Sequence, residues 1–489
     1  MTKEIENELQ SLIKKKVQGH QTFINFAELA ERYYANENDI TFNKSPSNES
    51  DASKTSTVAG LRSADNRVSH NWHQLLVDQK VAYALTYPPL FDVDDKELNK
   101  DIAAVIGSDD DFAKESKDLA IHASNTGIGW LHYWVDETTG KFDFASVDPK
   151  QVVPIYDGKL KSKLIGLIRT YIELDEVTLK EFIVYEYWTT ETLRVMRQEK
   201  TTTMEAPLQP YNLFSLYDIG TRQKIGETNE YRHDRGEVPF IPFANNSLKK
   251  GDLHRYKSLI DIYDKVFSGF VNDVEDMQEI ILVLTNYGGT DLAEFKEDLK
   301  TFKAIKVTND GSGDGSGVDK LAIEIPVEAR KTILEMTKEQ IFVSGQGVNP
   351  NQELSTSVSG VALKQIYSLL ELRTSMMESQ FRIGYSRLVK AILRFLGKNP
   401  DDYQVKQTWT RTKIDNDLEQ SQVIQNLAAV TSDENLAKAN PIVEDWEAEL
   451  ALQKKEAAEV SRMEDDYLTA KATNKVPDGK VEDVIGNGE

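Results

Sequence analysis

Apolar residues recur at steps of three and four along several long stretches of this chain, which is the spacing of one buried helix face. The clearest stretch covers 253–284, with one stripe over about nine turns, or roughly 45–50 Å at 1.5 Å per residue. A second helix is predicted at 326–345, and a third at 361–396, where Gly384 allows a bend or a close helix contact. Helices with stripes this long are expected to pack against other long elements, in a bundle or beside copies of themselves.

The region before 253 mixes helices with strands. Helical spacing covers 1–40, 70–88 and 110–126, while the polar stretch 43–57 predicts an exposed loop. Alternating apolar and polar residues predict short strands at 130–136, 142–148, 152–157, 164–174 and 181–190. With a further strand at 403–411, the predicted fold class is α+β and rich in helix.

A compact insert separates the first two long helices. NYGG at 286–289 is expected to end the first helix, and the insert then shows a short helix, a strand at 304–307, a glycine-rich turn and a strand at 320–325. A small mixed insert between long helices is unusual for a self-contained enzyme, and it suits a radial assembly whose stripes neighbouring subunits cover. After residue 412 the pattern predicts helices up to 472 and a disordered tail at 473–489.

Composition excludes several classes of protein. The 489 residues include no cysteine, which excludes disulfides, thiolate metal sites and thiol nucleophiles. The longest strictly apolar run, about 280–284, is far shorter than the roughly 18–20 residues of a membrane span, and no secretory signal is recognised. The formal net charge of −22 is the opposite of a conventional DNA-binding module. This acidity serves either solubility or a channel surface that does not hold a passing polyanion, and composition does not decide between them.

The search for catalytic, cofactor and metal sites predicts none. The run GSGDGSG at 311–317 lacks the spacing of a phosphate-binding loop and is interpreted as a flexible hairpin turn. A calcium loop starting at Asp310 would need Glu where Leu321 stands. His70 and His73 have no third ligand at useful spacing, and no carboxylate pair is distinguished among eighty acidic residues.

Several segments, in a constant order, resemble the portal protein family of long-tailed phages of Gram-positive hosts. The resemblance is carried by FASVDPKQVVPIYD (144–157), by 238–289, and by three later segments. These are KLAIEIPVEARKTILEMTKEQIF, SGVALKQIYSLLELR and ANPIVEDWEAEL. The likeness extends from about Phe23 to Leu450.

This resemblance implies a portal fold, one subunit of a ring of about twelve around a DNA-wide channel. The implied regions are a wing (1–252), two stem helices (253–284 and 326–345) with a clip between them (285–325), a tunnel loop (346–360), a long wing-spanning helix with a return strand (361–412), and a crown (413–472). The implied function is a channel at the capsid vertex for packaging, retaining and ejecting DNA. The implied partners are double-stranded DNA, the terminase large subunit, scaffolding and major capsid proteins, and the head-completion adaptor, with no membrane. The implied location is the virion, after assembly in the host cytoplasm.

Two sets of residues are candidates for contact with DNA or the motor. The tunnel loop contains no Lys or Arg, and it offers neutral hydrogen-bonding groups and one carboxylate: Asn349, Asn351, Gln352, Glu353, Ser355, Thr356 and Ser357. Such contacts are weak and sequence-independent, as a passing polymer requires, although an ordinary exposed loop has the same composition. On the clip helix, Lys296, Lys300 and Lys303 share one face, which is either a contact for DNA or the motor or simply a solvated face.

Two other classes of protein remain open from the residues alone. A cytosolic nucleotide-using α+β enzyme would share the mixed composition, but the missing phosphate-binding motifs count against it. A non-phage structural ring protein would share the oligomer without the DNA channel.

Overall fold

The computed structural model describes two compact units. The described ranges are 2–42, 64–107, 111–136, 138–160, 163–201, 206–218, 220–233, 235–276, 281–285, 317–321, 326–349, 360–411 and 450–459, with the single positions 426, 431, 432 and 462. The first unit comprises 1–352 and 367–412, and the second comprises 353–366 and 413–489. In the second unit, residues 450–459 are helical. The elements below belong to the first unit, apart from the beginning of α9.

The helices of the first unit come mostly from the two ends of its sequence. They are α1 (Thr2–Tyr34), α2 (Asp39–Phe42), α3 (Trp72–Ala84), α4 (Lys96–Ile106), α5 (Asp111–Thr126), α6 (Lys257–Asp276), α8 (Val327–Gly345) and α9 (Gly360–Phe395), with 3-10 turns η1 (Pro149–Gln151), η2 (Asp252–Arg255) and η3 (Pro400–Asp402). Local signals explain several ends. The Asp95 carboxylate accepts from the amides of Glu97 and Leu98 at the start of α4, and α8 follows Pro326 directly.

The strands form antiparallel sheets. They are β1 (Leu90–Asp92), β2 (Ile128–Val135), β3 (Phe142–Val147), β4 (Val152–Tyr156), β5 (Leu164–Asp175), β6 (Lys180–Trp188), β7 (Thr192–Glu199), β8 (Gln209–Pro210), β9 (Phe214–Tyr217), β10 (Lys224–Thr228), β11 (Glu230–Arg232), β12 (Phe240–Ala244), β13 (Ile281–Thr285), β14 (Gly317–Leu321) and β15 (Lys406–Thr408). The largest sheet has the order β11-β7-β6-β5-β4 with β8 beside β7, and a second has the order β12-β2-β3. The pairs β9–β10, β1–β15 and β13–β14 complete the described pairing.

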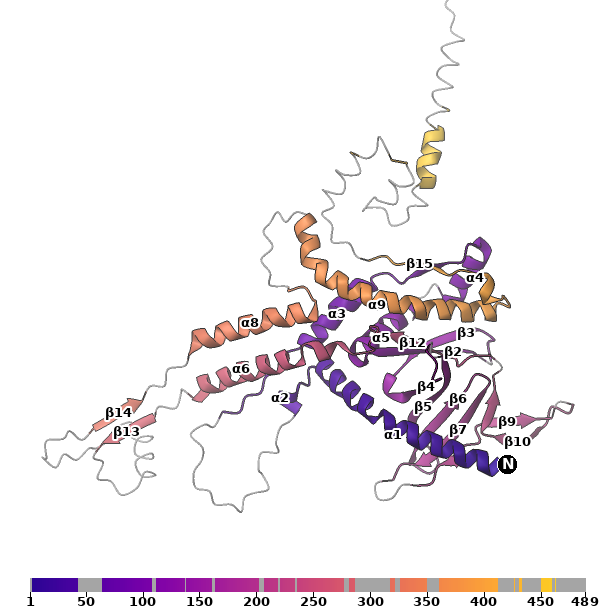
Figure 1. The fold of residues 1–489 in the computed structure, drawn as a ribbon, viewed down its shortest axis with the longest axis horizontal. Helices are drawn as coiled ribbons and strands as arrows, with labels where there is room; N and C mark the ends of the chain where they lie inside the picture. The colour runs from indigo at the N-terminus through magenta and orange to yellow at the C-terminus, as the bar shows by residue number, and fades with distance from the viewer. Residues whose placement is uncertain are drawn as a thin grey trace, which may run out of the picture. The chain divides into compact units, whose positions relative to one another are not determined.

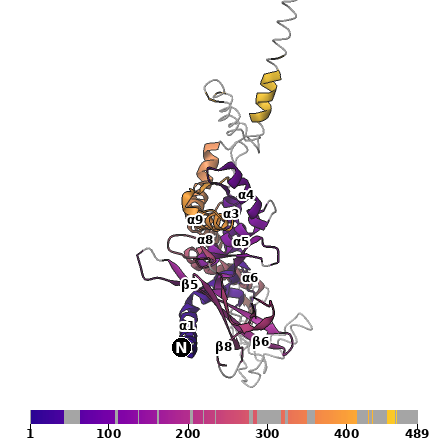
Figure 2. The same cartoon turned by 90° about the vertical axis from the view of Figure 1, so that its right-hand side faces the viewer.

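The largest buried cluster lies where α3, α5 and α9 meet strands β2 and β12 (Figures 1 and 2). Phe243 of β12 and Phe381 and Tyr385 of α9 are fully buried there, with the Phe243 and Tyr385 rings 4.9 Å apart. Gly384 lies against the Phe243 ring, since a Cβ at this position would be 2.5 Å from Cε1 of Phe243. Gly384 therefore allows a close approach of α9, made here to strand β12 and not to another helix, because a larger residue would push α9 away from β12.

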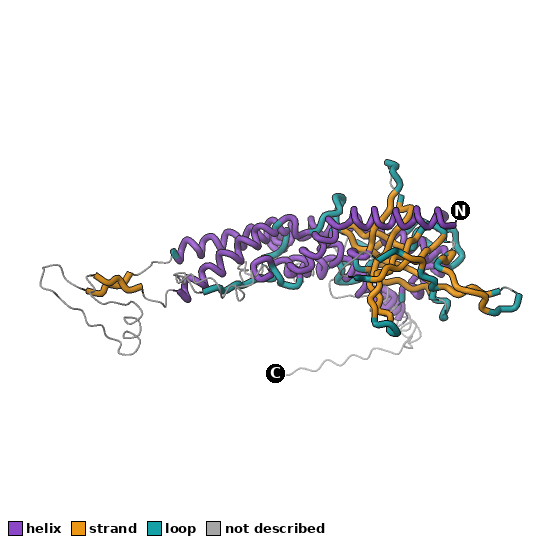
Figure 3. Tube along the Cα trace, turned by 90° about the horizontal axis from the view of Figure 1, so that it is seen from below, coloured by secondary structure: helices purple, strands orange, loops and turns teal. Residues whose placement is uncertain are grey.

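Helices α6 and α8 lie side by side, with β13 following α6 and β14 preceding α8 in the chain (Figures 1 and 3). Arg330 of α8 forms an ion pair with Asp273 of α6, and its guanidinium lies over the ring of Phe270. Ile260, Ile341 and Phe342 are buried nearer the other end of the pair. The pair is thus held by an apolar contact at one end and a charged contact toward the other.

Most predicted elements are present in the structure. The helical patterns correspond to α1, α3, α5, α8 and α9, and the five predicted strands correspond to β2, β3, β4, β5 and β6. The short helices α2 and α4, the strand β1 and the strands β7 to β12 were not predicted individually.

The prediction of a helix over 253–284 is wrong at both ends. Residues 252–255 form a 3-10 turn, α6 ends at Asp276, and 281–285 form β13, where Ile281 pairs with Leu321. Apolar residues at 281 and 284 fit a helix stripe, but the run ILVLT also fits a strand, and pairing with β14 selects the strand. The predicted helix stop at 286–289 lies outside the described residues.

Two predicted strands also differ in extent. The strand expected at 320–325 is β14, which covers Gly317–Leu321. The strand expected at 403–411 is only Lys406–Thr408, and it pairs with β1.

The two histidines weighed as metal ligands have other partners in the fold. The Nδ1 of His70 lies 2.7 Å from the carboxylate of Asp264, and the Nδ1 of His73 lies 2.8 Å from the Tyr256 hydroxyl. Within the described ranges no cluster of three or more His, Cys, Asp or Glu forms a metal site. Over those same ranges, no helix is long and apolar enough to cross a membrane.

Folding stability should fall as the pH is lowered from about 6.5 toward 5, because two buried histidines resist protonation. Burial lowers the pKa of His132 to about 4 and that of His73 to about 3, below the ordinary 6.5 of an unfolded chain. In this window the unfolded chain takes up protons that the folded chain does not, and each histidine contributes a loss of up to about 1.4 kcal/mol per pH unit.

Urea unfolding across this pH range measures the effect, with a His132→Phe variant as comparison. The variant's stability should depend less steeply on pH, because one buried histidine no longer titrates. The slopes are compared and not the absolute stabilities, because the variant also loses the contact between Nδ1 and the Pro239 carbonyl oxygen. Equal slopes in the two proteins would contradict the assignment.

Candidate functional site at the start of the 346–360 loop

Helix α8 ends in a left-handed turn that begins the predicted tunnel loop. Gln346 has a φ of 52°, and the amides of Gln346 and Gly347 donate to the carbonyls of Val343 and Phe342 at 3.1 and 3.0 Å. This conformation is common at helix ends when glycine occupies it, but it is strained for glutamine. Contacts from elsewhere in the fold are therefore needed to hold the turn.

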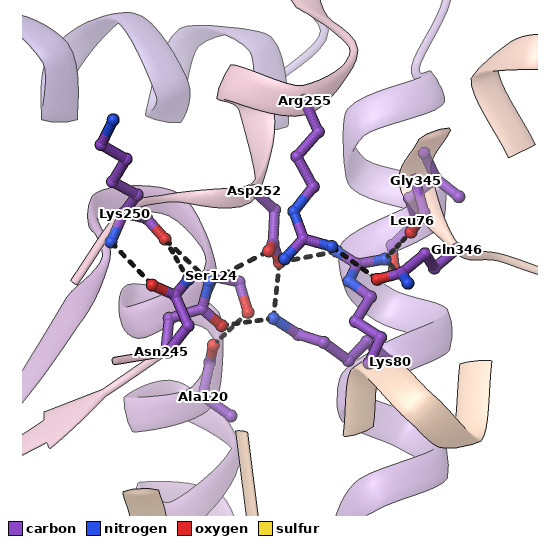
Figure 4. A network of polar contacts seen from close by, with 12 residues as sticks. Leu76, Lys80, Ala120, Ser124, Asn245, Lys250, Asp252, Arg255, Gly345 and Gln346 are labelled. Carbon is purple, nitrogen blue, oxygen red and sulfur yellow. Dashed lines mark hydrogen bonds and ion pairs between the residues drawn. The ribbon is translucent and has the colours of Figure 1, made fainter. Parts of the chain in front are cut away.

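Side chains from α3, η2 and α9 supply those contacts. Arg373 of α9 donates to the carbonyl of Gly345 at 2.7 Å, and Arg255 of η2 donates to Oε1 of Gln346 at 2.5 Å (Figure 4). Gln79 of α3 makes two bonds to Val348, accepting from its amide at 3.0 Å and donating to its carbonyl at 2.8 Å. Residues 345–348 are thus held by three separate elements.

Behind this turn lies a buried charge cluster (Figure 4). The Oδ2 atom of Asp252 accepts from Lys80 Nζ at 2.5 Å and from Arg373 Nη2 at 2.6 Å. Asn245 donates to the other carboxylate oxygen at 3.0 Å and accepts from Lys80 at 2.7 Å. All four residues are buried, with Lys80 completely inaccessible, so the Asp252–Lys80–Arg373 cluster is an ionic junction inside the fold.

The cluster controls the protonation of its members. Burial alone would raise the pKa of Asp252, but the charges of Arg373 and Lys80 outweigh it and hold that pKa far below its usual range. Burial lowers the pKa of Lys80 to about 7, although Asp252 opposes this change. Asp252 is therefore ionised throughout the neutral range, and it holds Arg373 in place.

The predicted DNA-contact residues are only partly within the described structure. Asn349 is partly exposed, directly after the residue that Gln79 holds. Asn351, Gln352, Glu353, Ser355, Thr356 and Ser357 lie outside the described residues, as do Lys296, Lys300 and Lys303 of the predicted clip helix.

Sequence reasoning did not single out the charge cluster, although a signal was present. Lys80 falls in the apolar stripe of its helix, between Val77 and Ala84, and Arg373 falls between Leu370 and Met377. A lysine or arginine on a buried helix face requires a partner, since burying an unpaired charge is very costly. This pattern predicts a buried ion pair, but it does not identify the partner.

Comparison with known proteins gives the family. Residues 13–463 match the family described as "Phage portal protein, SPP1 Gp6-like". The portal protein of Clostridium phage phiCD119 is 39% identical over 451 residues, covering 90% of this chain and 94% of that protein. The portal protein of Bacillus phage SPP1 is 32% identical over 460 residues, covering 89% of this chain and 84% of that protein. The chain belongs to the SPP1 Gp6-like family of phage portal proteins.

Distant structural similarities accompany the family match. A chain of the neck of an empty GTA particle, computed with C6 symmetry, has a TM-score of 0.44 at 10% identity, covering 76% of this chain and 90% of that one. A chain of the virion of a native gene transfer agent particle has a TM-score of 0.42 at 10% identity, with coverages of 75% and 89%. Phage portal proteins are structural components of the virion, so membership places this chain among capsid proteins and not in a family of enzymes.

Proposed function

We propose that this portal protein assembles into a closed ring of about twelve copies around a DNA channel at one capsid vertex. In this assignment the α+β region of 1–252 is the wing, α6 and α8 are the stem helices, 285–325 is the clip, 346–360 is the tunnel loop, and 413–472 is the crown. The family match and the pairing of α6 with α8 support the assignment. The terminase large subunit, scaffolding and major capsid proteins and a head-completion adaptor are the proposed partners, with assembly in the host cytoplasm.

The main observation in favour of a ring is that α8 and α9 each have an exposed, mostly apolar seam. On α8 the exposed positions with alternating steps of four and three are Ala329, Ile333, Met336, Gln340 and Val343. On α9 they are Leu369, Leu372, Met376, Ser379 and Ile383. Met336 is 64% exposed and Leu372 is 52% exposed in the single chain. Seams with this spacing and without a charged residue suit a neighbouring helix, and in a ring the neighbour is the next copy.

The charge distribution supports DNA passage more than DNA binding. The net charge is −22, and the 346–360 loop carries no Lys or Arg. At physiological salt, screening acts over about 8 Å, so DNA in the channel would feel only the charges nearest to it. A loop with neutral hydrogen-bonding groups and one carboxylate would contact DNA without holding it.

A lysine in the α8 seam should dissociate the ring while leaving the subunit folded. Native mass spectrometry of the unmodified protein should show a species of about 660 kDa, for twelve copies of 55.3 kDa. Met336→Lys should shift the population to monomers with unchanged circular dichroism, because the exposed side chain adds little to the fold of one chain. Glu335→Lys, on the flank of the same helix, is the matched control and should still form rings. Monomers or dimers alone in the unmodified protein, over a range of salt concentrations, would argue against the ring.

A further inference from the structure

The first residues of the 346–360 loop are tied to two elements that precede the loop by many residues. We propose that Gln79 and Arg255 are positioning residues, which fix the starting point of the channel loop relative to α3 and to the beginning of α6. This inference rests on the proposed function, in which the 346–360 loop lies at the DNA channel. The contacts of Gln79 and Arg255 themselves lie within the described residues.

Gln79 binds Val348 in the manner of a neighbouring strand. Its amide group accepts from the Val348 N–H and donates to the Val348 carbonyl, so both backbone groups of one residue are paired by one side chain. Glutamine is suited to this because its terminal amide carries a donor and an acceptor side by side. Val348 is only partly buried, and water could satisfy the same groups if Gln79 were absent. The stability of the fold does not require the pairing of Gln79 with Val348. The pairing instead sets the position of Val348.

Arg255 connects the first position of the loop, Gln346, to α6. It is the last residue of η2, and α6 begins two residues later at Lys257. Its guanidinium donates to the side chain of Gln346, the residue in the left-handed conformation. A shift of the start of α6 would therefore act, through this hydrogen bond, on the side chain of Gln346, the strained residue of the turn.

The buried junction forms a second connection between the same two places. Asp252, in the same 3-10 turn as Arg255, holds Arg373, and Arg373 donates to the carbonyl of Gly345. The beginning of α6 is thus joined to residues 345 and 346 by two independent routes, one exposed and one buried. Figure 4 shows Arg255 and Asp252 on one side and Gly345 and Gln346 on the other.

Close packing leaves the turn little freedom to move alone. A Cβ on Gly345 would lie 2.5 Å from Cδ1 of Leu76, and one on Gly347 would lie 2.8 Å from Oε1 of Gln79. Backbone at 345–347 therefore lies directly on α3 with no space for adjustment. Because the turn cannot yield locally, a displacement of α6 or α3 is passed on to the position where the loop begins.

The test replaces Gln79 by methionine, which has a similar length but neither hydrogen-bonding group. Gln74→Met is the matched control, since Gln74 is also partly buried on α3 and makes none of the hydrogen bonds to 345–348 described above. Both variants are made in the full chain, alone and in capsids. Hydrogen exchange of the Val348 amide and nuclease-protected DNA per capsid are measured, together with ring mass and thermal unfolding.

In Gln79→Met, exchange at Val348 should accelerate about tenfold, while ring mass and unfolding temperature should match the control. DNA retention should fall in Gln79→Met and not in Gln74→Met. An Arg255→Met variant should accelerate exchange at Gln346 and Gly347 in the same way.

The outcomes separate this inference from the proposed function. Unchanged exchange at Val348 overturns the positioning role, whatever happens to DNA. Accelerated exchange with normal DNA retention also overturns it, because the position of the loop would then have no consequence. An unmodified chain that forms no ring and supports no DNA packaging would refute the proposed function, and the exchange result would still report the contacts.

Discussion

Replacing Asp252 by asparagine should lower the free energy of unfolding by about 3–5 kcal/mol, the range expected when one partner of a buried charge network is removed. Asparagine has nearly the same shape, so the loss comes from charge and not from a cavity. Lys80 and Arg373 would remain buried with no carboxylate between them, where Asp252 now accepts from both at 2.5 and 2.6 Å. Denaturant unfolding at neutral pH measures the change.

A surface carboxylate gives the matched control for this substitution. Asp401 lies 3.6 Å from Lys390 with its side chain 84% exposed, so Asp401→Asn should change stability by less than about 1 kcal/mol. Adding Lys80→Met to Asp252→Asn should recover part of the loss. The pKa of Lys80 is already lowered to about 7 and would fall further without Asp252, so the buried amine would have to remain charged without a partner or lose its proton, and methionine avoids both costs. A loss below about 1 kcal/mol in Asp252→Asn would mean that solvent reaches the cluster.

Deleting residues 349–357 should abolish DNA retention while leaving ring assembly intact. Loop-closure entropy changes slowly with length, so the shortened connection between α8 and α9 should cost the fold little. The deletion begins after Val348, so the contacts of Gln79, Arg255 and Arg373 are kept. Capsids carrying the variant should have normal shape but contain little nuclease-protected DNA.

A charge change in the same loop should act differently from its removal. In a ring of about twelve copies, Glu353→Lys removes about twelve negative charges and adds about twelve positive ones around the DNA, and phosphate contacts should then slow its passage. Packaging rate and final DNA content are measured separately for this reason.

Normal packaging and retention in the deletion variant would show that the loop has no essential role at the DNA.

Long periodic segments were predicted well because their signals are local. The patterns for α1, α8 and α9 repeat over many turns, and Pro326 marks the start of α8. Alternation over β5 and β6 is equally long, and these two strands pair along most of their length. The resemblance to portal proteins was also carried by the sequence alone, since it depends on the order of several segments.

Short elements were predicted poorly because local propensity does not determine them. In β13, ILVLT fits either a helix stripe or a strand, and its pairing with β14 decides the outcome. Residues 406–408 form a strand because they meet β1, more than 300 residues earlier in the chain, as in the pair Leu90–Thr408. Three residues contain too little pattern to predict such a partner.

The sequence by itself determined the long helices, the strand-rich region, the absence of cysteine, the acidic charge and the family. Only the tertiary structure decided what holds the start of the channel loop. Lys80 and Arg373 are recognisable as charges on apolar helix faces, but their common partner, Asp252, is 172 residues from one and 121 from the other. The choice among eighty carboxylates depends on which one the packed helices bring into the same buried space, and no local pattern contains that information.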